Sequence, residues 1–140
     1  MKNKVFPCLW FENNAKEAAE FYCSVFKDSE ILEDTPLVVT FRLNGQKFMG
    51  LNGGNMFKFN ESVSFVVNCE SQEEIDYYWE KLTDGGKESM CGWLSDKYGV
   101  SWQIVPSNIS QLMSDPVRAE RIMKVIYQMR KLDINMMNNA

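Results

Sequence analysis

The chain has 140 residues, of which 45% are hydrophobic and 24% charged, and it contains no histidine. This length is typical of one domain, and this composition excludes a disordered or fibrous protein. The net charge of -4, with lysines and arginines spread along the chain, predicts no nucleic-acid partner. No apolar run approaches the roughly 20 residues that a membrane-spanning helix needs, and no secretory signal opens the chain. We therefore expect a cytoplasmic protein that does not contact membranes.

The first half of the chain predicts a strand, a helix and a hairpin. An apolar run over residues 5–11 predicts the strand, and the spacing of Asn14 and Glu17 is that of a capping box before a helix over residues 15–26. Asn44-Gly45 then separates two alternating runs, which predicts a β-hairpin because both turn positions require positive φ. A two-residue turn at this point places Phe41 opposite Phe48.

The second half repeats this order. Residues 62–69 form a β-branched and aromatic run, and Ser71 and Glu74 have the spacing of a second capping box before a helix that ends near Thr83. Strands are expected over residues 91–95 and 100–106, around a turn in which Asp96 bonds its own backbone two residues on. The sequence therefore predicts an α+β fold of two βαβββ modules, about residues 1–56 and 57–106.

Residues 107–140 predict a helical extension. Asn108 is placed to cap a short helix, and Asp115-Pro116 supplies an N-cap and an N1 proline for a longer one. An apolar stripe of Ile122, Ile126, Met129 and Leu132 predicts that the longer helix continues past residue 130, and residues 135–140 are expected to fray. The extension is expected to close the core over an exposed sheet edge; a lid or an oligomer contact is the alternative.

Several segments in order carry a resemblance to a known family. They are LWFENNAKEAAEFYCSVF at 9–26, LNGG at 51–54, FKFNESVSFVV at 57–67, YYWEKLTDGG at 77–86 and CGWLSDKYGVSWQIVP at 91–106. With them the chain resembles the PhnB-like branch of the vicinal oxygen chelate, or glyoxalase-like, superfamily. This branch is often labelled the 3-demethylubiquinone-9 3-methyltransferase domain.

The resemblance implies a single glyoxalase-like domain over residues 1–140, whose sheets curl into a cup around a small-molecule cavity, and it implies a homodimer. Metal-bearing relatives hold their ligands at four inward positions, which correspond here to Phe6 or Cys8, Gly50, Ser64 and Gln103. A glycine and a serine do not replace the imidazoles that zinc, nickel and iron favour. We therefore expect no metal and no other cofactor.

The methyltransferase label is not supported by the glycine pattern. A fold that binds S-adenosylmethionine usually carries a glycine-rich loop between a strand and a helix of a parallel sheet. Here Gly53-Gly54 follows a hairpin and Gly85-Gly86 ends a helix. The label is therefore treated as a family name.

Period-2 alternation predicts which side chains line the cup. The lining is apolar and aromatic with a few amides and hydroxyls, which is typical of a site for a small, partly apolar molecule. The predicted ligand-binding residues are Cys8, Trp10, Phe41, Phe48, Asn52, Ser64, Asn68, Trp93 and Gln103. Trp102 alternates with Gln103 and should face a helix. The alternative is a filled core, in which the protein would serve an interaction or structural role.

No catalytic residue is identified. Cys8 and Cys91 are candidate nucleophiles, but no histidine is present to act as their base, and no pair of carboxylates stands out as an acid and a base. A zinc site built from all four cysteines is disfavoured because Cys23 lies on a predicted helix. A metal-independent enzyme remains an alternative to a binding protein.

Overall fold

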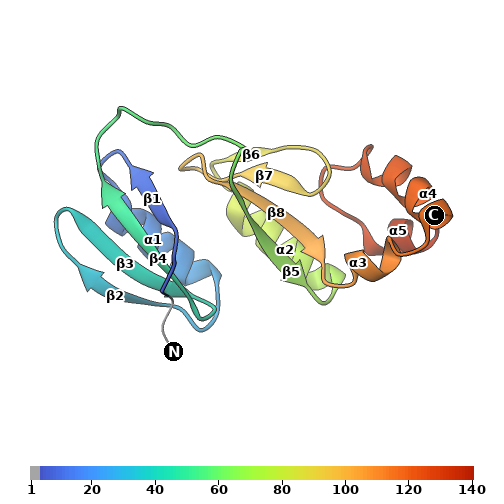
Figure 1. Cartoon of the computed structure of the whole chain (residues 1–140), viewed down its shortest axis with the longest axis horizontal. Helices are drawn as coiled ribbons and strands as arrows, with labels where there is room; N and C mark the ends of the chain where they lie inside the picture. Colours follow the sequence, from blue (N-terminus) through green and yellow to red (C-terminus); the bar gives the residue numbers. More distant parts are fainter. Residues whose placement is uncertain (1–3) are drawn as a thin grey trace. The chain divides into compact units, whose positions relative to one another are not determined.

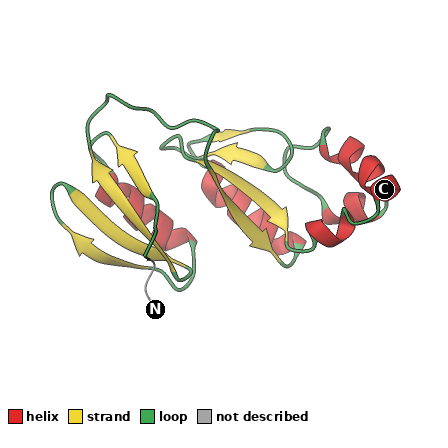
Figure 2. Cartoon of the chain, viewed as in Figure 1, coloured by secondary structure: helices red, strands yellow, loops and turns green. Residues whose placement is uncertain are grey.

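The computed structural model describes residues 4–140, which form two compact units, one ending at Phe59 and the other beginning at Asn60. Each unit contains a four-stranded sheet with a helix against one face (Figures 1 and 2). The strand orders are β1-β4-β3-β2 and β5-β8-β7-β6, so the second unit repeats the topology of the first. The predicted pair of βαβββ modules is confirmed.

The first unit is organised around the β3–β4 hairpin. Its elements are β1 (Cys8–Phe11), α1 (Ala15–Val25), β2 (Glu30–Asp34), β3 (Val38–Leu43) and β4 (Gln46–Asn52). The turn residues Asn44 and Gly45 have φ of 48° and 86°, as a two-residue hairpin requires. Phe41 pairs with Phe48, and their rings stack with centroids 5.5 Å apart, so the predicted register is confirmed.

Helix α1 covers one face of the first sheet at very short range. A Cβ added at Gly50 of β4 would lie 3.1 Å from the Cβ of Ala15 and 3.3 Å from the ring of Phe11. Tyr22 of α1 is fully buried and lies with its ring 6.2 Å from that of Phe41. Glycine at position 50 therefore allows the helix to approach the strand closely.

The second unit has the same plan. Its elements are β5 (Ser64–Cys69), α2 (Gln72–Thr83), β6 (Lys87–Glu88), β7 (Trp93–Ser95) and β8 (Ser101–Pro106). The Ser71 hydroxyl accepts from the Glu74 N–H at 3.2 Å, which confirms the capping prediction. Asp96 accepts from the Tyr98 N–H at 2.8 Å, as predicted, and also from the Trp102 indole N–H at 2.9 Å.

The structure corrects the predicted cap of α1. Helix α1 begins at Ala15, but the Asn14 side chain makes no capping bond and its Oδ1 is buried without a hydrogen-bond partner. The Ala15 N–H instead donates to Oδ1 of Asn52 at 2.9 Å. A side chain from the end of β4 therefore replaces the local cap.

Two strands carried no signal in the sequence. Strand β2 is mostly acidic and exposed, and its register against β3 shifts between Ile31 and Glu33. Strand β6 has only two residues, Lys87 and Glu88. Both are edge strands, which form by hydrogen bonding to a neighbour and need no apolar alternation of their own.

The extension contains three helices, α3 (Ile109–Leu112), α4 (Pro116–Ile126) and α5 (Ile134–Asn138). The predicted Asp115 cap and N1 proline of α4 are confirmed. The prediction of a helix through residue 132 is wrong, because α4 ends at Ile126 and the buried Met129 and Leu132 lie in the segment that follows.

The end of the chain does not fray as predicted. Asp133 caps α5 by accepting from the Met136 N–H at 3.0 Å, and Met137 is fully buried. The extension forms its own core with Val105 at the end of β8. Of the helices in residues 4–140, none is long and apolar enough to cross a membrane.

We expect Gly86→Ala to destabilise the second unit. Its Cβ would lie 2.2 Å from the carbonyl oxygen of Ser95 and 2.9 Å from the Cα of Asp96, so backbone would have to move. Overpacking of this kind costs about 1–3 kcal/mol or more, which urea denaturation would measure as a lower midpoint. Ser89→Ala, at an exposed position nearby, is the control and should leave the midpoint unchanged.

Candidate functional site

In each unit the helix packs on one face of the sheet and does not cover the other face. Residues directly opposite each other on neighbouring strands lie on the same face, and successive residues alternate between faces. The residues that pack under each helix therefore identify those of the opposite face. We call the opposite face of each sheet its open face.

The open face of the second sheet brings together four of the predicted binding residues. The helix side of this sheet carries Val67, Ile104 and Leu94. Leu94 pairs there with the buried Trp102, which confirms the prediction that Trp102 faces a helix. The alternating residues on the open face are Ser64, Val66 and Asn68 of β5, Trp93 and Ser95 of β7, and Ser101, Gln103 and Val105 of β8. Ser64, Asn68, Trp93 and Gln103 therefore share one surface.

Polar and aromatic groups lie side by side at the centre of this face. The Gln103 Nε2 donates to the Ser64 Oγ at 2.9 Å, and Trp93 lies opposite Gln103 on the other neighbouring strand. Ser64, Trp93 and Gln103 are all half-buried, whereas Val66, opposite Gln103 on β5, is 55% exposed. An amide and a hydroxyl thus lie next to an apolar surface that water can reach.

The open face of the first sheet carries Cys8 and Trp10. Cys8 pairs with Met49, and Trp10 pairs with Leu51, which in turn pairs with Val38. Met49, Leu51 and Val38 are half-buried and were not among the predicted site residues. The pairing of β1 with β4, which no local pattern reveals, is what assigns them to this face.

Three predicted site residues lie on the other side of this sheet. The helix face of this sheet carries Phe41, Phe48 and Asn52 together with Gly50. A Cβ added at Gly50 would lie 3.1 Å from the Cβ of Ala15 on α1. Grouping them with Cys8 and Trp10 on one surface was therefore wrong. The prediction started the alternation of β3 and β4 one residue out of phase with that of β1, and the stacking of Phe41 on Tyr22 of α1 fixes the true phase.

Asn52 is fully engaged in local structure. Its Oδ1 accepts from the Ala15 N–H at 2.9 Å and its Nδ2 donates to the Pro36 carbonyl at 3.0 Å. Each half of the amide therefore holds backbone in place.

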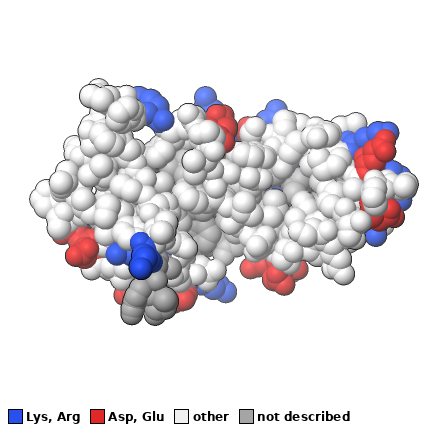
Figure 3. Space-filling model, viewed as in Figure 1, with Lys and Arg blue, Asp and Glu red and all other residues white. Residues whose placement is uncertain are grey.

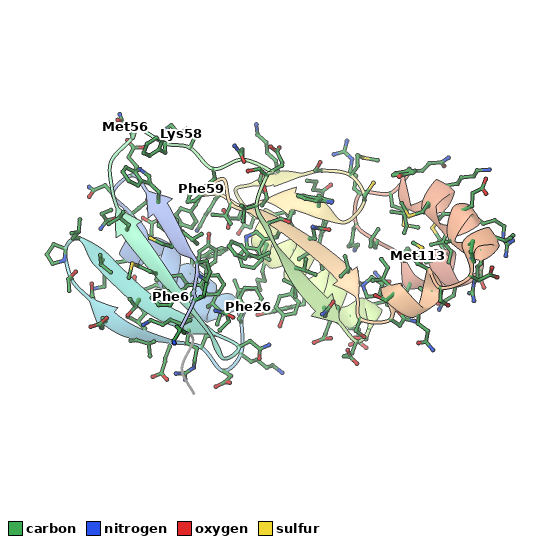
Figure 4. The ribbon with its side chains drawn as sticks, viewed as in Figure 1. Phe6, Phe26, Met56, Lys58, Phe59 and Met113 are labelled. Carbon is green, nitrogen blue, oxygen red and sulfur yellow. The ribbon has the colours of Figure 1, made fainter. Side chains whose placement is uncertain are left out.

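Trp10 is held by the loop that follows β4. Its indole N–H donates to the Gly54 carbonyl at 2.8 Å, and a Cβ added at Gly53 would lie 2.4 Å from the indole ring. Phe57 contacts it edge-on, with centroids 4.8 Å apart. Further along this loop, Phe59, which Figure 4 labels, packs against Phe11 with ring centroids 5.4 Å apart. Trp10 is therefore positioned by its own unit.

The donors on the open faces do not fit a metal ion. Gly50, the predicted counterpart of a ligand on β4, faces α1, and its neighbours on the open face are Met49 and Leu51. On the second sheet the counterparts are Ser64 and Gln103, which hydrogen-bond each other. Residues 4–140 contain no group of three or more histidine, cysteine or acidic side chains that could hold a metal.

The cysteines show no sign of activation as nucleophiles. Burial raises the pKa of the Cys8 thiol, and burial followed by the charge of Glu30 raises that of Cys23. Burial, with the charges of Glu74 and Glu70, raises the pKa of Cys69 to about 12. A reactive cysteine has its pKa lowered, not raised. Cys91 lies outside β7 and packs against the core of the extension.

Charge on the surface is mixed. Lys124 lies 3.9 Å from Glu120 on α4, and Figure 3 shows basic and acidic side chains next to each other at this end of the chain. On the visible face, no broad patch of one sign covers either sheet.

Asn52→Ala should lower the free energy of unfolding by about 1 kcal/mol, because it removes the acceptor for a helix N-terminal N–H. Asn52→Asp keeps the acceptor and adds a negative charge at the N-terminus of α1, but it loses the donor to the Pro36 carbonyl, so its stability should lie between those of wild type and Asn52→Ala. Urea denaturation measures both, with the exposed Asn55→Ala as control. Equal stability of Asn52→Ala and wild type would contradict the structural role.

The raised pKa of Cys69 predicts that the protein loses stability at high pH. The folded thiol stays neutral up to a pKa of about 12, whereas the unfolded thiol ionises near its ordinary 9.0. Between these values the folded state binds more protons, so stability falls as pH rises. Urea denaturation from about pH 8 to 10.5 should show a shallower decline for Cys69→Ala than for wild type. Parallel declines would contradict the raised pKa.

Comparisons with known proteins agree on one family. A family model described as 3-demethylubiquinone-9 3-methyltransferase matches residues 3–105. Among solved structures, a PhnB protein from Bacillus cereus that carries the same family name is 38% identical, and 74% of this chain covers 99% of it with a TM-score of 0.68. Among curated proteins, none matches the chain.

More distant structures share the fold alone. Protein PA1353 from Pseudomonas aeruginosa is 18% identical with a TM-score of 0.62, and 75% of this chain covers 98% of it. The fosfomycin resistance protein FosX from Listeria monocytogenes, solved with Mn(II) and sulfate, is 12% identical with a TM-score of 0.57; 79% of this chain covers 94% of it.

Proposed function

Because this chain belongs to the 3-demethylubiquinone-9 3-methyltransferase family and has a glyoxalase-like fold, we propose that it binds a small, partly apolar molecule, without a metal, on the open face of its second sheet. The observation that carries the proposal is the cluster of Ser64, Trp93 and Gln103. It offers one ring face for stacking and two polar groups for orientation.

The chemistry of this cluster indicates what kind of molecule fits. An indole favours a flat apolar or aromatic group, and an amide and a hydroxyl can each donate and accept. Gln103 and Ser64 satisfy each other in the free protein, so a ligand with one acceptor and one donor can replace that bond without leaving a buried group unpaired. A hydroxylated or carbonyl-bearing ring meets these requirements.

Metal-free binding is supported by the donor set. The open face of the second sheet carries amides, hydroxyls, an indole and aliphatic groups. Hard divalent cations select carboxylates and water, and zinc selects imidazole and thiolate. Neither set is present on this face.

Binding is tested by screening small hydroxylated and carbonyl-bearing aromatic compounds against the purified chain by thermal shift and tryptophan fluorescence. For any hit, Gln103→Leu should weaken binding by about tenfold or more, because it leaves the partner group of the ligand without a hydrogen bond. Gln111→Leu, at an exposed position of the extension, is the matched control. Unchanged affinity in Gln103→Leu would rule out this face as the site.

Methyl transfer, the reaction named by the family label, makes a separate prediction. Neither glycine pair precedes a helix: Gly54, with φ of 96°, lies in the loop after β4, and Gly85, with φ of 78°, follows α2. We therefore expect S-adenosylmethionine to leave the melting temperature unchanged, since a ligand that binds only the folded state must raise it. A concentration-dependent rise would support methyl transfer and contradict the binding proposal as stated.

A further inference from the structure

The helical extension lies beyond the part of the chain that the family shares. The family model ends at residue 105, and 99% of the Bacillus cereus protein is covered by only 74% of this chain. Its role therefore cannot be read from the family and must come from its own residues.

The extension is attached beside the open face of the second sheet. Met129 and Arg130 supply carbonyls that accept from the N–H groups of Cys91 and Gly92, each at 2.8 Å. Cys91 lies two residues before Trp93, the first residue of β7, so its N–H bond to Met129 holds the extension beside the start of β7. Val105, on the open face two residues after Gln103, is part of the buried core of the extension.

A second set of polar contacts joins the extension to the start of α2. The Gln72 Nε2 donates to the Leu132 carbonyl at 3.0 Å, and the Gln72 Oε1 accepts from the Ile134 N–H at 2.8 Å. Lys131 forms an ion pair with Asp76 at 2.8 Å. These contacts fix the path of the segment between α4 and α5.

The apolar contacts of the extension depend heavily on methionine. Five of the nine methionines lie within it, at 113, 123, 129, 136 and 137. Met129 and Met137 belong to the buried core, Met113 and Met123 are half-buried and pack against that core, and Met136 is 54% exposed. Figure 4 labels Met113 at this end of the chain.

Met113 and Met123 combine two properties that the other methionines of the extension have only singly. Each is partly exposed to solvent, and each packs against the buried core. Met136 is accessible but does not belong to the core or its packing neighbours, and Met137 is in the core but fully buried. Methionine sulfoxide is polar and disrupts apolar contacts of this kind.

We propose that Met113 and Met123 are oxidation sites whose conversion to sulfoxide by a hydroperoxide releases the extension from Val105 and Cys91. In each event one peroxide O–O bond breaks, one oxygen atom forms the S=O bond, and the other leaves as water when the oxidant is hydrogen peroxide. The sulfur loses two electrons and the peroxide gains them. A reductase that acts on methionine sulfoxide would reverse the change.

The test uses the full chain, treated with increasing hydrogen peroxide, quenched and then reduced with a thiol reductant, which restores reversibly oxidised cysteines but leaves sulfoxides. Peptide mass spectrometry measures oxidation at each methionine. The same digest measures the rate at which Cys91 is labelled by N-ethylmaleimide before digestion. Release of the extension should raise that rate, because the half-buried Cys91 then loses the core of the extension that packs against it.

Conservative variants separate the proposal from general damage. Met→Leu substitutions preserve volume, so the double variant Met113→Leu with Met123→Leu should keep slow Cys91 labelling after peroxide treatment. Met136→Leu and Met56→Leu, both at exposed positions, should respond as wild type does.

Three results would each overturn the proposal. The first is oxidation of Met113 and Met123 without faster Cys91 labelling, and the second is faster labelling in the double leucine variant. The third is persistence of both thioethers while Met56 and Met136 are oxidised. None of these readouts requires a bound ligand, so the outcome is independent of the binding proposal.

Discussion

The close approach of helix α1 to strand β4 is the contact on which the arrangement of the first unit depends. Gly50 allows this close approach, because a Cβ at this position would lie 3.1 Å from the Cβ of Ala15 and 3.3 Å from the ring of Phe11. Once that face is closed by the helix, strand alternation leaves Met49 and Leu51 on the opposite face. The close approach at Gly50 and the stacking of Phe41 on Tyr22 thus agree on which side chains face the helix and which lie on the open face.

The sequence predicts local structure well and the relation between distant strands poorly. The Asn44-Gly45 turn and the Ser71 cap are each set by a few neighbouring residues, and both were predicted correctly. The cap of α1 was not, because its acceptor comes from Asn52, far along the chain. Edge strands β2 and β6 are likewise defined by their partners rather than by their own pattern.

The same distinction explains the candidate site. In the second unit the prediction gave β5, β7 and β8 the right relative phase, and the pairing of β8 with β5 and β7 places Ser64, Trp93 and Gln103 on one face. In the first unit the corresponding relation, the register of β1 against β4, was predicted one residue out of phase. Alternation gives the phase within a strand, and only tertiary packing relates the phases of two strands.

The extension shows a further case in which tertiary contacts decide. The spacing of Ile122, Ile126, Met129 and Leu132 fits one continuous helix, yet helix α4 ends at Ile126. The backbone of the following segment bonds Cys91, Gly92 and Gln72 instead of continuing the helical ladder, and it still buries Met129 and Leu132. Methionine suits this role because its unbranched chain fills irregular spaces that a rigid side chain would leave empty. The same thioether is chemically oxidisable, and among the methionines of the extension those at 113 and 123 are both partly exposed and packed against this core.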